Sequence, residues 1–424
     1  MANSVIENEA ARLAADARGI EFHYDLPAAF FRLFLDPTMS YSCHYFRTPQ
    51  ESLTQAALNK LQLVARKIAL TADDRVLDIG CGWGSFVLWA AETYGCHVTG
   101  ITLSPSQAAY VREQAAARGL ADRVAVHVMH ANAMTFPAAS FDKIVTIGAI
   151  EHIEDLAGLW RDCRRLLRDG ADARLLAHGM TVPVAARRES PASTLSGEET
   201  FIQEYIFPVG RFRHQWEVIR SLAVNDFEVI DVENITDHYT LTLRHWLANL
   251  MAHAGDLGAA SGVPPERFRA QLLFLAGSAE AFAENRILCY QTLTRKLTLG
   301  APRTPLPATR EGYLLPEAGS RQMAEGRDAP VVPPESGDTT VVIEIAGDDP
   351  EIWTIAVRQG QAPQILPGPH EKPTCRLRIA RDDFADLLDG RLRWTDAFVR
   401  GRTAFEGNLA AAIALRKLLM GDGA

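Results

Sequence analysis

The chain lacks the features of a secreted or membrane-spanning protein. Residues 1–9 carry acids where a signal peptide needs bases, and no uninterrupted apolar run approaches the length that spans a bilayer. The six cysteines are scattered, without a CxxC pair or a cluster with metal-ligand spacing. We therefore expect a cytoplasmic protein with reduced thiols and no metal site.

Positive charge is also too scarce for a typical nucleic-acid-binding protein. The chain has 43 lysines and arginines against 52 acids, a formal net charge of -9, so we expect no nucleic-acid partner. One cluster of bases recurs at helical spacing: Arg161, Arg164, Arg165 and Arg168. We interpret it as a solvated helix face, with a peripheral contact to anionic lipid headgroups of a membrane as the alternative.

The hydrophobic content is ample for packed cores, at 47% of 424 residues. From Arg75 onwards short apolar strands alternate with helical segments, which predicts parallel pairing in an α/β doubly wound sheet. The expected strands are residues 76–79, 98–103, 124–129, 144–147 and 175–176, with 227–232 as a late strand.

Composition divides the chain into four parts. Residues 1–70 have helical periodicity and form an N-terminal segment of the next domain, residues 71–300. Helical periodicity returns within that domain over 200–297, which we interpret as a lid over the strand ends. Residues 301–339 contain seven prolines and predict an extended linker. Residues 340–424 predict a small α+β domain, because period-two segments precede helical ones.

A glycine-rich turn follows the first expected strand. Asp78 ends the strand, Gly80, Gly82 and Gly84 follow at alternate positions, and a helical pattern begins at Ser85. Such a turn lets a ligand lie against bare backbone near a helix N-terminus. Dinucleotide-binding folds use a similar turn with longer spacing. Here the preceding acid indicates a ligand with a cation and a ribose, such as S-adenosylmethionine, and hence a class I methyltransferase; Trp83 belongs to the same turn.

The second expected strand ends without the acid that many methyltransferases use to bind the ribose hydroxyls. The polar residues available there are Thr102, Ser104 and Gln107. Ser104 is also a good N-cap, with Pro105 at the first helical position, and both roles can hold together.

The fourth expected strand leads into Glu151 and His152, at the edge where ligands of open α/β sheets bind. We expect Glu151 to be an active-site acid, with a surface pair that caps the next helix as the alternative. Adjacent residues cannot both face one point, so His152 is expected to pack or to orient the loop.

Residues 20–297 resemble the cyclopropane fatty acid synthases and mycolic acid cyclopropane synthases. The resemblance rests on motifs in the family's order: residues 23–46, 76–84, 100–104, 147–152, 204–210, 238–239 and 286–296. It implies that an apolar alkene attacks the methyl group of S-adenosylmethionine, and that the resulting carbocation loses a proton as a ring closes. It further implies a bound bicarbonate held by Cys43, Glu151, His178 and Tyr239, with Tyr41 lining the site. The alternative for these residues is an ordinary role in packing.

Two departures from the family pattern leave details open. After the third expected strand, where the family usually contacts adenine through an aromatic or an acid, only His130 or Asn132 could form a hydrogen bond. Gly179 and Met180 follow His178 where the family tends to have a hydroxyl and a β-branched residue. The pocket is therefore expected to be reshaped, and the product could be a cyclopropane or a simple methyl.

Residues 340–420 resemble a sterol-carrier-protein-2-type lipid-binding domain, through residues 382–390, 396–398 and 401–408. The resemblance implies an apolar tunnel that presents a greasy substrate; the alternative is an apolar face that forms a homodimer surface. Our main hypothesis is therefore a cyclopropane synthase-type methyltransferase acting on unsaturated lipid. A small natural product as substrate, or a lipid-binding protein with a degenerate methyltransferase domain, are the alternatives.

Overall fold

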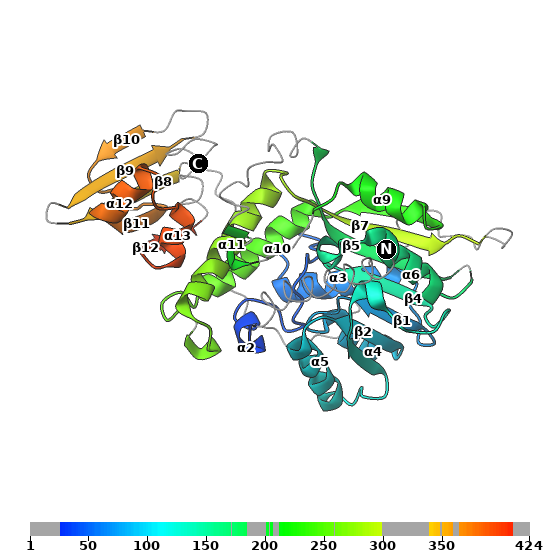
Figure 1. The fold of residues 1–424 in the computed structure, drawn as a ribbon. Helices are drawn as coiled ribbons and strands as arrows, with labels where there is room; N and C mark the ends of the chain where they lie inside the picture. The colour runs from blue at the N-terminus through cyan, green and yellow to red at the C-terminus, as the bar shows by residue number, and fades with distance from the viewer. Residues whose placement is uncertain are drawn as a thin grey trace, which may run out of the picture. The chain divides into compact units, whose positions relative to one another are not determined.

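The structure is a computed structural model that describes residues 26–170, 172–184, 201–202, 204–206, 212–257, 259–298, 339–347, 350–358 and 364–409 (Figure 1). Most of the expected linker, the first part of the N-terminal segment and the last part of the predicted α+β domain, residues 410–424, lie outside these residues. Within them, no helix is both long and apolar enough to cross a membrane.

A seven-stranded sheet forms the centre of the larger part, in the order β3-β2-β1-β4-β5-β7-β6. Its strands are β1 (Arg75–Ile79), β2 (His97–Thr102), β3 (Val124–Val128), β4 (Lys143–Ile147), β5 (Arg174–Thr181), β6 (Phe227–Asn234) and β7 (Leu288–Lys296). The first five pair in parallel, and β7 pairs antiparallel with both β5 and β6. The predicted α/β doubly wound sheet is confirmed.

Helices cover both faces of this sheet. One core packs α3 (Leu53–Lys67), α4 (Ser85–Tyr94) and α5 (Pro105–Ala117) around strand residues that include Val76. The other packs α6 (Leu156–Leu166) and α9 (Gln215–Ala223) around residues that include Leu77. Because successive side chains of a strand point to opposite faces, one apolar run in β1 supplies both cores.

Two sequence predictions need correction. The N-terminal segment is not continuously helical: α2 (Ala28–Phe31) is a single turn, and the chain then runs irregularly to α3. Asp36 holds this irregular stretch by accepting hydrogen bonds from Thr38 and from His44 Nε2, the latter at 3.1 Å. The helical periodicity expected through residue 297 fails at β7, whose residues are buried along most of its length. A strand that is covered on both faces lacks the alternation of apolar and polar residues by which a strand is recognised in a sequence.

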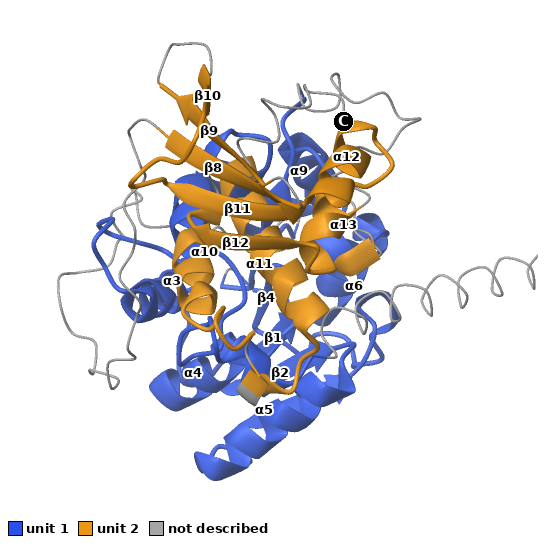
Figure 2. Cartoon of the chain, turned by 90° about the vertical axis from the view of Figure 1, so that its left-hand side faces the viewer, with its two compact units in different colours: residues 1–189, 207–242, 282–328 blue, residues 190–206, 243–281, 329–424 orange. Residues whose placement is uncertain are grey.

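The remaining elements belong to a second compact unit, residues 190–206, 243–281 and 329–424 (Figure 2). It contains most of α10 (Thr236–Met251), α11 (Pro265–Ala283) and the 3-10 turn η3 (Ala259–Ser261). The five-stranded sheet of this unit has the order β10-β9-β8-β11-β12. Its elements are β8 (Thr339–Ala346), β9 (Glu351–Val357), β10 (Gln364–Pro367), β11 (Cys375–Ala380), β12 (Thr403–Gly407), α12 (Arg381–Leu388) and α13 (Trp394–Val399). The predicted α+β character of this region is confirmed.

Polar contacts join α13 to other segments of the second unit. Arg393 donates to Glu204 Oε2 at 2.6 Å, and the Tyr205 hydroxyl donates to Asp396 Oδ1 at 3.2 Å. Arg269 of α11 donates to the carbonyl of Val399 at 3.3 Å. The C-terminal fold is thus tied to α11 and to residues 204–205.

Candidate active site

A pocket opens at the carboxyl ends of β1, β2 and β4, where the topology of an open α/β sheet places ligands. Seven of the predicted cofactor residues line it: Asp78, Gly80, Gly82, Trp83, Thr102, Gln107 and His130. Three others, Gly84, Ser104 and Asn132, do not. His152 and Tyr41 also line the pocket.

The glycine turn provides an open wall. Gly80 (φ +78°) is packed tightly, since a Cβ there would lie 2.5 Å from the Cβ of Ala149. Gly82 (φ +52°) faces open space, with no atom within 4 Å of such a Cβ. Both adopt backbone conformations that favour glycine. Gly84 serves the fold as the left-handed N-cap of α4, where a side chain would strike Val111.

Asp78 is prepared for a cationic ligand. The side chain is 2% exposed, and its Oδ1 has no hydrogen-bond partner among the described residues. Burial raises the pKa of Asp78 to about 7, and the positive charge of Lys60 opposes that rise. A buried carboxylate oxygen without a partner is costly, so a ligand that brings a positive group suits this position.

At the end of β2 the polar residues divide their roles. Ser104 is the N-cap of α5 and accepts a hydrogen bond from the Gln107 amide at 3.2 Å, so the capping interpretation is confirmed. The Thr102 hydroxyl donates to Gln107 Oε1 at 2.8 Å, whereas Gln107 Nε2 is buried without a partner among the described residues. Gln107 therefore offers a free donor to a hydroxyl-bearing ligand.

The two candidate residues after β3, His130 and Asn132, also have different roles. His130 lines the pocket at the start of η1 (Ala131–Ala133), and its Nδ1 accepts a hydrogen bond from the Asn132 amide at 3.0 Å. The Asn132 side chain donates to the carbonyl of Asp155 at 2.9 Å. Asn132 thus stabilises the loop and leaves His130 as the better placed of the two.

The sequence analysis did not identify all polar residues of the pocket; those it missed include Ser40, Ser42 and Lys60. The Lys60 ammonium, on α3, donates to the hydroxyls of Ser40 and Ser42, the latter at 3.0 Å. The one sign in the sequence was that Lys60 lies among the apolar residues of an amphipathic helix. That sign is weak, because a lysine in such a helix is equally typical of a solvated position.

Glu151 lies in η2 (Ile150–His152), just after β4, and is 3% exposed. Its Oε1 accepts a hydrogen bond from the Met180 amide at 2.6 Å, whereas Oε2 has no partner among the described residues. Burial raises the pKa of Glu151 to about 7, although backbone hydrogen bonds and Arg213 oppose the rise. A carboxyl group with such a pKa can both accept and return a proton near neutrality.

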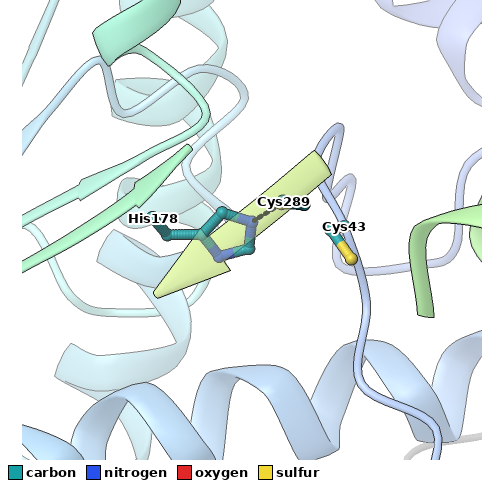
Figure 3. Close-up of side chains that lie close together, drawn as sticks. All are labelled: Cys43, His178 and Cys289. Carbon is teal, nitrogen blue, oxygen red and sulfur yellow. Dashed lines mark hydrogen bonds between the residues drawn. The ribbon is translucent and has the colours of Figure 1, made fainter. Parts of the chain in front are cut away.

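His178, Cys289 and Cys43 form a buried cluster (Figure 3). His178 Nε2 lies 3.5 Å from Cys289 Sγ, and Gln291 Nε2 lies 3.4 Å from His178 Nδ1. Burial and the charges of Lys60 and Lys67 hold the pKa of His178 well below its usual range, so the imidazole is neutral. Lys67 donates in turn to Gln291 Oε1 at 2.8 Å, which fixes the amide that faces the imidazole.

The same cluster has the side chains of a thiophilic metal site. One ligand atom each from Cys43, His178 and Cys289 lies within 4.8 Å of the others. Cysteine sulfur and imidazole nitrogen are the ligands that zinc and similar cations prefer. The family resemblance grouped Cys43 with His178, but Cys289 was not predicted to join them, because the three residues come from an N-terminal loop, β5 and β7.

The two predicted tyrosines lie in aromatic surroundings. The ring of Tyr239, on α10, packs on Phe282 with centroids 4.5 Å apart. Burial, with Cys289, Cys43 and Glu151 nearby, holds the pKa of Tyr239 well above its usual value, so the phenol remains protonated. Tyr41 contacts Phe31 and Phe34 edge to face, with centroids 5.4 and 5.8 Å apart.

Three of the four arginines in the basic cluster on and after α6 form contacts within the chain. Arg164 pairs with Asp226, Arg165 with Asp162, and Arg168 with Asp142. Arg165 also donates to the carbonyls of Met134 and Phe136. These contacts favour the solvated helix face over a surface for lipid headgroups.

Two known protein families match this chain, one over each of the two regions whose resemblance was noted from the sequence. Residues 11–292 match the mycolic acid cyclopropane synthetase family, and residues 335–420 match the SCP-2 sterol transfer family. A probable fatty acid methyltransferase of Pseudomonas putida is 38% identical over 299 residues, covering 70% of this chain and 73% of the relative. Cyclopropane mycolic acid synthase 1 of Mycobacterium tuberculosis is 36% identical over 271 residues, covering 62% of this chain and 91% of the relative.

Solved structures give the same result. The cyclopropane synthase MmaA2 from Mycobacterium tuberculosis aligns with a TM-score of 0.60 at 30% identity, covering 66% of this chain and 98% of that one. Mycolic acid cyclopropane synthase CmaA1, complexed with SAH and CTAB, aligns with a TM-score of 0.59 at 33% identity, over the same shares. The chain therefore belongs to the mycolic acid cyclopropane synthetase family of S-adenosylmethionine-dependent methyltransferases, and it carries a C-terminal domain of the SCP-2 sterol transfer family.

Proposed function

We propose that this enzyme adds a methylene group to a carbon–carbon double bond of an unsaturated fatty acyl lipid, with bicarbonate bound beside Glu151, His178, Cys43 and Tyr239. The observation that carries the proposal is the buried carboxyl group of Glu151. Its pKa is about 7, and its Oε2 has no hydrogen-bond partner among the described residues. Such a group can take part in proton removal inside a site closed to water.

The residues present fit the two groups that the reaction needs. An open glycine turn and an unpaired buried carboxylate, Asp78, suit S-adenosylmethionine, which supplies an electrophilic methyl when bound. The neutral His178 and the protonated Tyr239 are donors that suit a small anion such as bicarbonate, which supplies a base when bound.

The protein's own part in the reaction is to stabilise a cation and keep water away. With the cofactor bound, the alkene π electrons would form the new bond to the methyl carbon as the methyl–sulfur bond breaks, which would release S-adenosylhomocysteine and leave a carbocation on the substrate. The faces of Tyr41 and Tyr239 can stabilise that charge. Ring closure then needs one proton removed from the new methyl group, with Glu151 placed to relay it.

We assign the C-terminal domain, after a linker at about 301–339, the role of binding an apolar chain and presenting it to the methyltransferase domain. Its contacts through Arg393 and Asp396 with residues 204–205, and through Val399 with Arg269 of α11, support this role. A surface for homodimers is the alternative. We place the reaction in the cytoplasm, which agrees with six free cysteines.

The proposal is tested in cells that contain unsaturated phospholipids but no synthase of their own. Cells expressing the protein are fed trideuteromethyl methionine, and total lipids are analysed by mass spectrometry. Two deuteriums retained on a bridging carbon are expected for cyclopropanation, whereas three would identify simple methylation.

An absence of labelled lipid, from a protein that binds S-adenosylhomocysteine, would overturn the lipid proposal and favour a small natural product containing an alkene. The remaining alternative, a lipid-binding protein with a degenerate methyltransferase domain, is disfavoured by the intact glycine turn with Asp78 and by the buried Glu151.

A further inference from the structure

A buried row of polar side chains crosses three strands of the large sheet. His178 of β5 lies directly opposite Gln291 of β7, and Gln291 lies opposite Glu233 of β6. Residues that are opposite each other in neighbouring strands point to the same face of a sheet, so the three side chains share one face. Gln291 is 0% and His178 1% exposed. Groups buried in this way need hydrogen-bond partners within the protein.

Lys67, the last residue of α3, contacts two members of this row. Its ammonium donates to Glu233 Oε2 and, at 2.8 Å, to Gln291 Oε1. An ammonium group has donors only, so the atom of the Gln291 amide that it contacts must be the oxygen. The reverse orientation of the amide would bring two donors together. Lys67 therefore determines which end of the Gln291 amide faces away from it.

The amide nitrogen of Gln291 consequently faces the imidazole of His178. The amide Nε2 lies 3.4 Å from His178 Nδ1. Because an amide nitrogen can only donate, Nδ1 must be the acceptor. His178 is neutral, since burial and the charges of Lys60 and Lys67 hold its pKa well below the usual range. In a neutral imidazole one nitrogen accepts and the other carries the hydrogen, so the hydrogen lies on Nε2.

This Nε2 faces the buried cluster, 3.5 Å from Cys289 Sγ (Figure 3). Sulfur is a weak acceptor, so the N–H group can still donate to a stronger one. An anion bound beside the cluster is a stronger acceptor. A soft cation would instead take its ligands from the sulfur atoms of Cys43 and Cys289, because a metal displaces thiol protons.

We propose that Gln291, oriented by Lys67, holds His178 in the tautomer with its hydrogen on Nε2, so that the imidazole is a fixed donor to the anion of the reaction. Gln291 and Lys67 act through His178 and are positioning residues. The tautomer follows from the contacts of these three residues, whereas its use in holding bicarbonate rests on the proposed function. A donor that is fixed in advance needs no rearrangement when charge develops.

The opposing interpretation gives Gln291 a purely structural role, in which it links β5, β7 and α3. The two roles differ in what they predict for the ring of His178. A structural role leaves either tautomer possible. A positioning role requires the hydrogen on Nε2 and lets a change at Gln291 alter where the hydrogen lies.

The test is nuclear magnetic resonance of the full-length protein with isotopically labelled histidine, in the absence of substrate and bicarbonate. The signals of His178 are identified by their loss in His178→Asn, and nitrogen shifts and couplings show which ring nitrogen carries the hydrogen. We expect the wild type at neutral pH to have hydrogen on Nε2 and none on Nδ1. Gln291→Glu should place a hydrogen on Nδ1, because a carboxylate accepts from the imidazole as well as from Lys67.

Thr292→Val is the matched control. It removes a buried polar group from the next position of β7, whose side chain points to the other face of the sheet, and should leave the tautomer unchanged. The donor role is tested by adding bicarbonate to wild-type protein saturated with S-adenosylhomocysteine. We expect the Nε2–H signal of His178 to shift.

Hydrogen on Nδ1 in the wild type, or an Nδ1 that stays without hydrogen in Gln291→Glu, would overturn the proposal. If Gln291→Glu does not fold, the wild-type spectrum still decides, because a hydrogen on Nδ1 is incompatible with an amide that donates to it. An Nε2–H signal that does not respond to bicarbonate would overturn the donor role. The tautomer is measured without lipid or bicarbonate, so its failure is distinguishable from a failure of the proposed function.

Discussion

The Met180 amide donates a 2.6 Å hydrogen bond to Glu151 Oε1, and this contact joins the segment of β5 after His178 to the turn that carries the candidate acid. It orients one oxygen of Glu151 and leaves the other free in the buried site. The position of Glu151 thus depends on β5 as much as on its own turn.

Replacing Glu151 should remove the proton relay and spare the cofactor. We expect Glu151→Gln to lower turnover by about 10²-fold or more, the usual range for a general acid or base. The affinity for S-adenosylhomocysteine should change by less than about threefold, because Glu151 does not line the cofactor pocket. Glu154→Gln, in an exposed residue three positions on, is the control. Turnover that survives Glu151→Gln would remove the assigned role.

Adding a methyl group at Gly179 should displace Glu151 without touching the cofactor. A Cβ there would lie 2.3 Å from Ile150 Cγ1 and 3.4 Å from Glu151 Oε1. We expect Gly179→Ala to lower turnover about tenfold or more, since small misplacements at a reacting centre are costly. Gly277→Ala, where a Cβ meets nothing within 4 Å, should be neutral. Comparable rates in the two variants would show that η2 tolerates the change.

The ionised Asp78 should lower the free energy of unfolding of the protein without ligand, although it contributes to cofactor binding. Its pKa is raised to about 7 in the folded protein, so between its unfolded value near 4 and pH 7 the folded state holds a proton that the unfolded state has released. Stability therefore falls as pH rises through this window. Asp78→Asn should increase the free energy of unfolding by on the order of 3 kcal/mol at pH 8, and by less at pH 5.

Thermal melts at the two pH values measure this difference, and S-adenosylhomocysteine titration should show that the variant binds poorly. A stability gain independent of pH would contradict the electrostatic cause. Retained binding would remove Asp78 from the cofactor site.

A soft cation should inhibit the enzyme at the cluster of Cys43, His178 and Cys289, whose ligand atoms lie within 4.8 Å of one another. We expect Cd²⁺ to reduce turnover and to produce thiolate-to-metal absorption, because metal binding displaces the thiol protons. Cys289→Ser should lose both effects, whereas Cys163→Ser, in the core around α6, should retain them. Equal sensitivity of the two variants would place the metal elsewhere.

Much of the fold could be predicted because its signals are local. The strand at 76–79 is a continuous apolar run, and Gly80 and Gly82 require the positive φ angles that the structure shows. Ser104 and Pro105 marked the start of α5 for similarly local reasons. In contrast, β7 was missed, since burial on both faces removes the alternation by which a strand is recognised.

The residues themselves determined the kind of ligand and the likeness to a family: an acid before a glycine turn, and Glu151 after a strand, keep their meaning in any chain that forms this sheet. Only the tertiary structure decided which polar groups are left without partners. The unpaired oxygen of Asp78, the nearby ammonium of Lys60 and the meeting of Cys43 with Cys289 depend on contacts between distant segments. Burial and pKa arise from everything that surrounds a group in space, and no local pattern in the sequence encodes those surroundings.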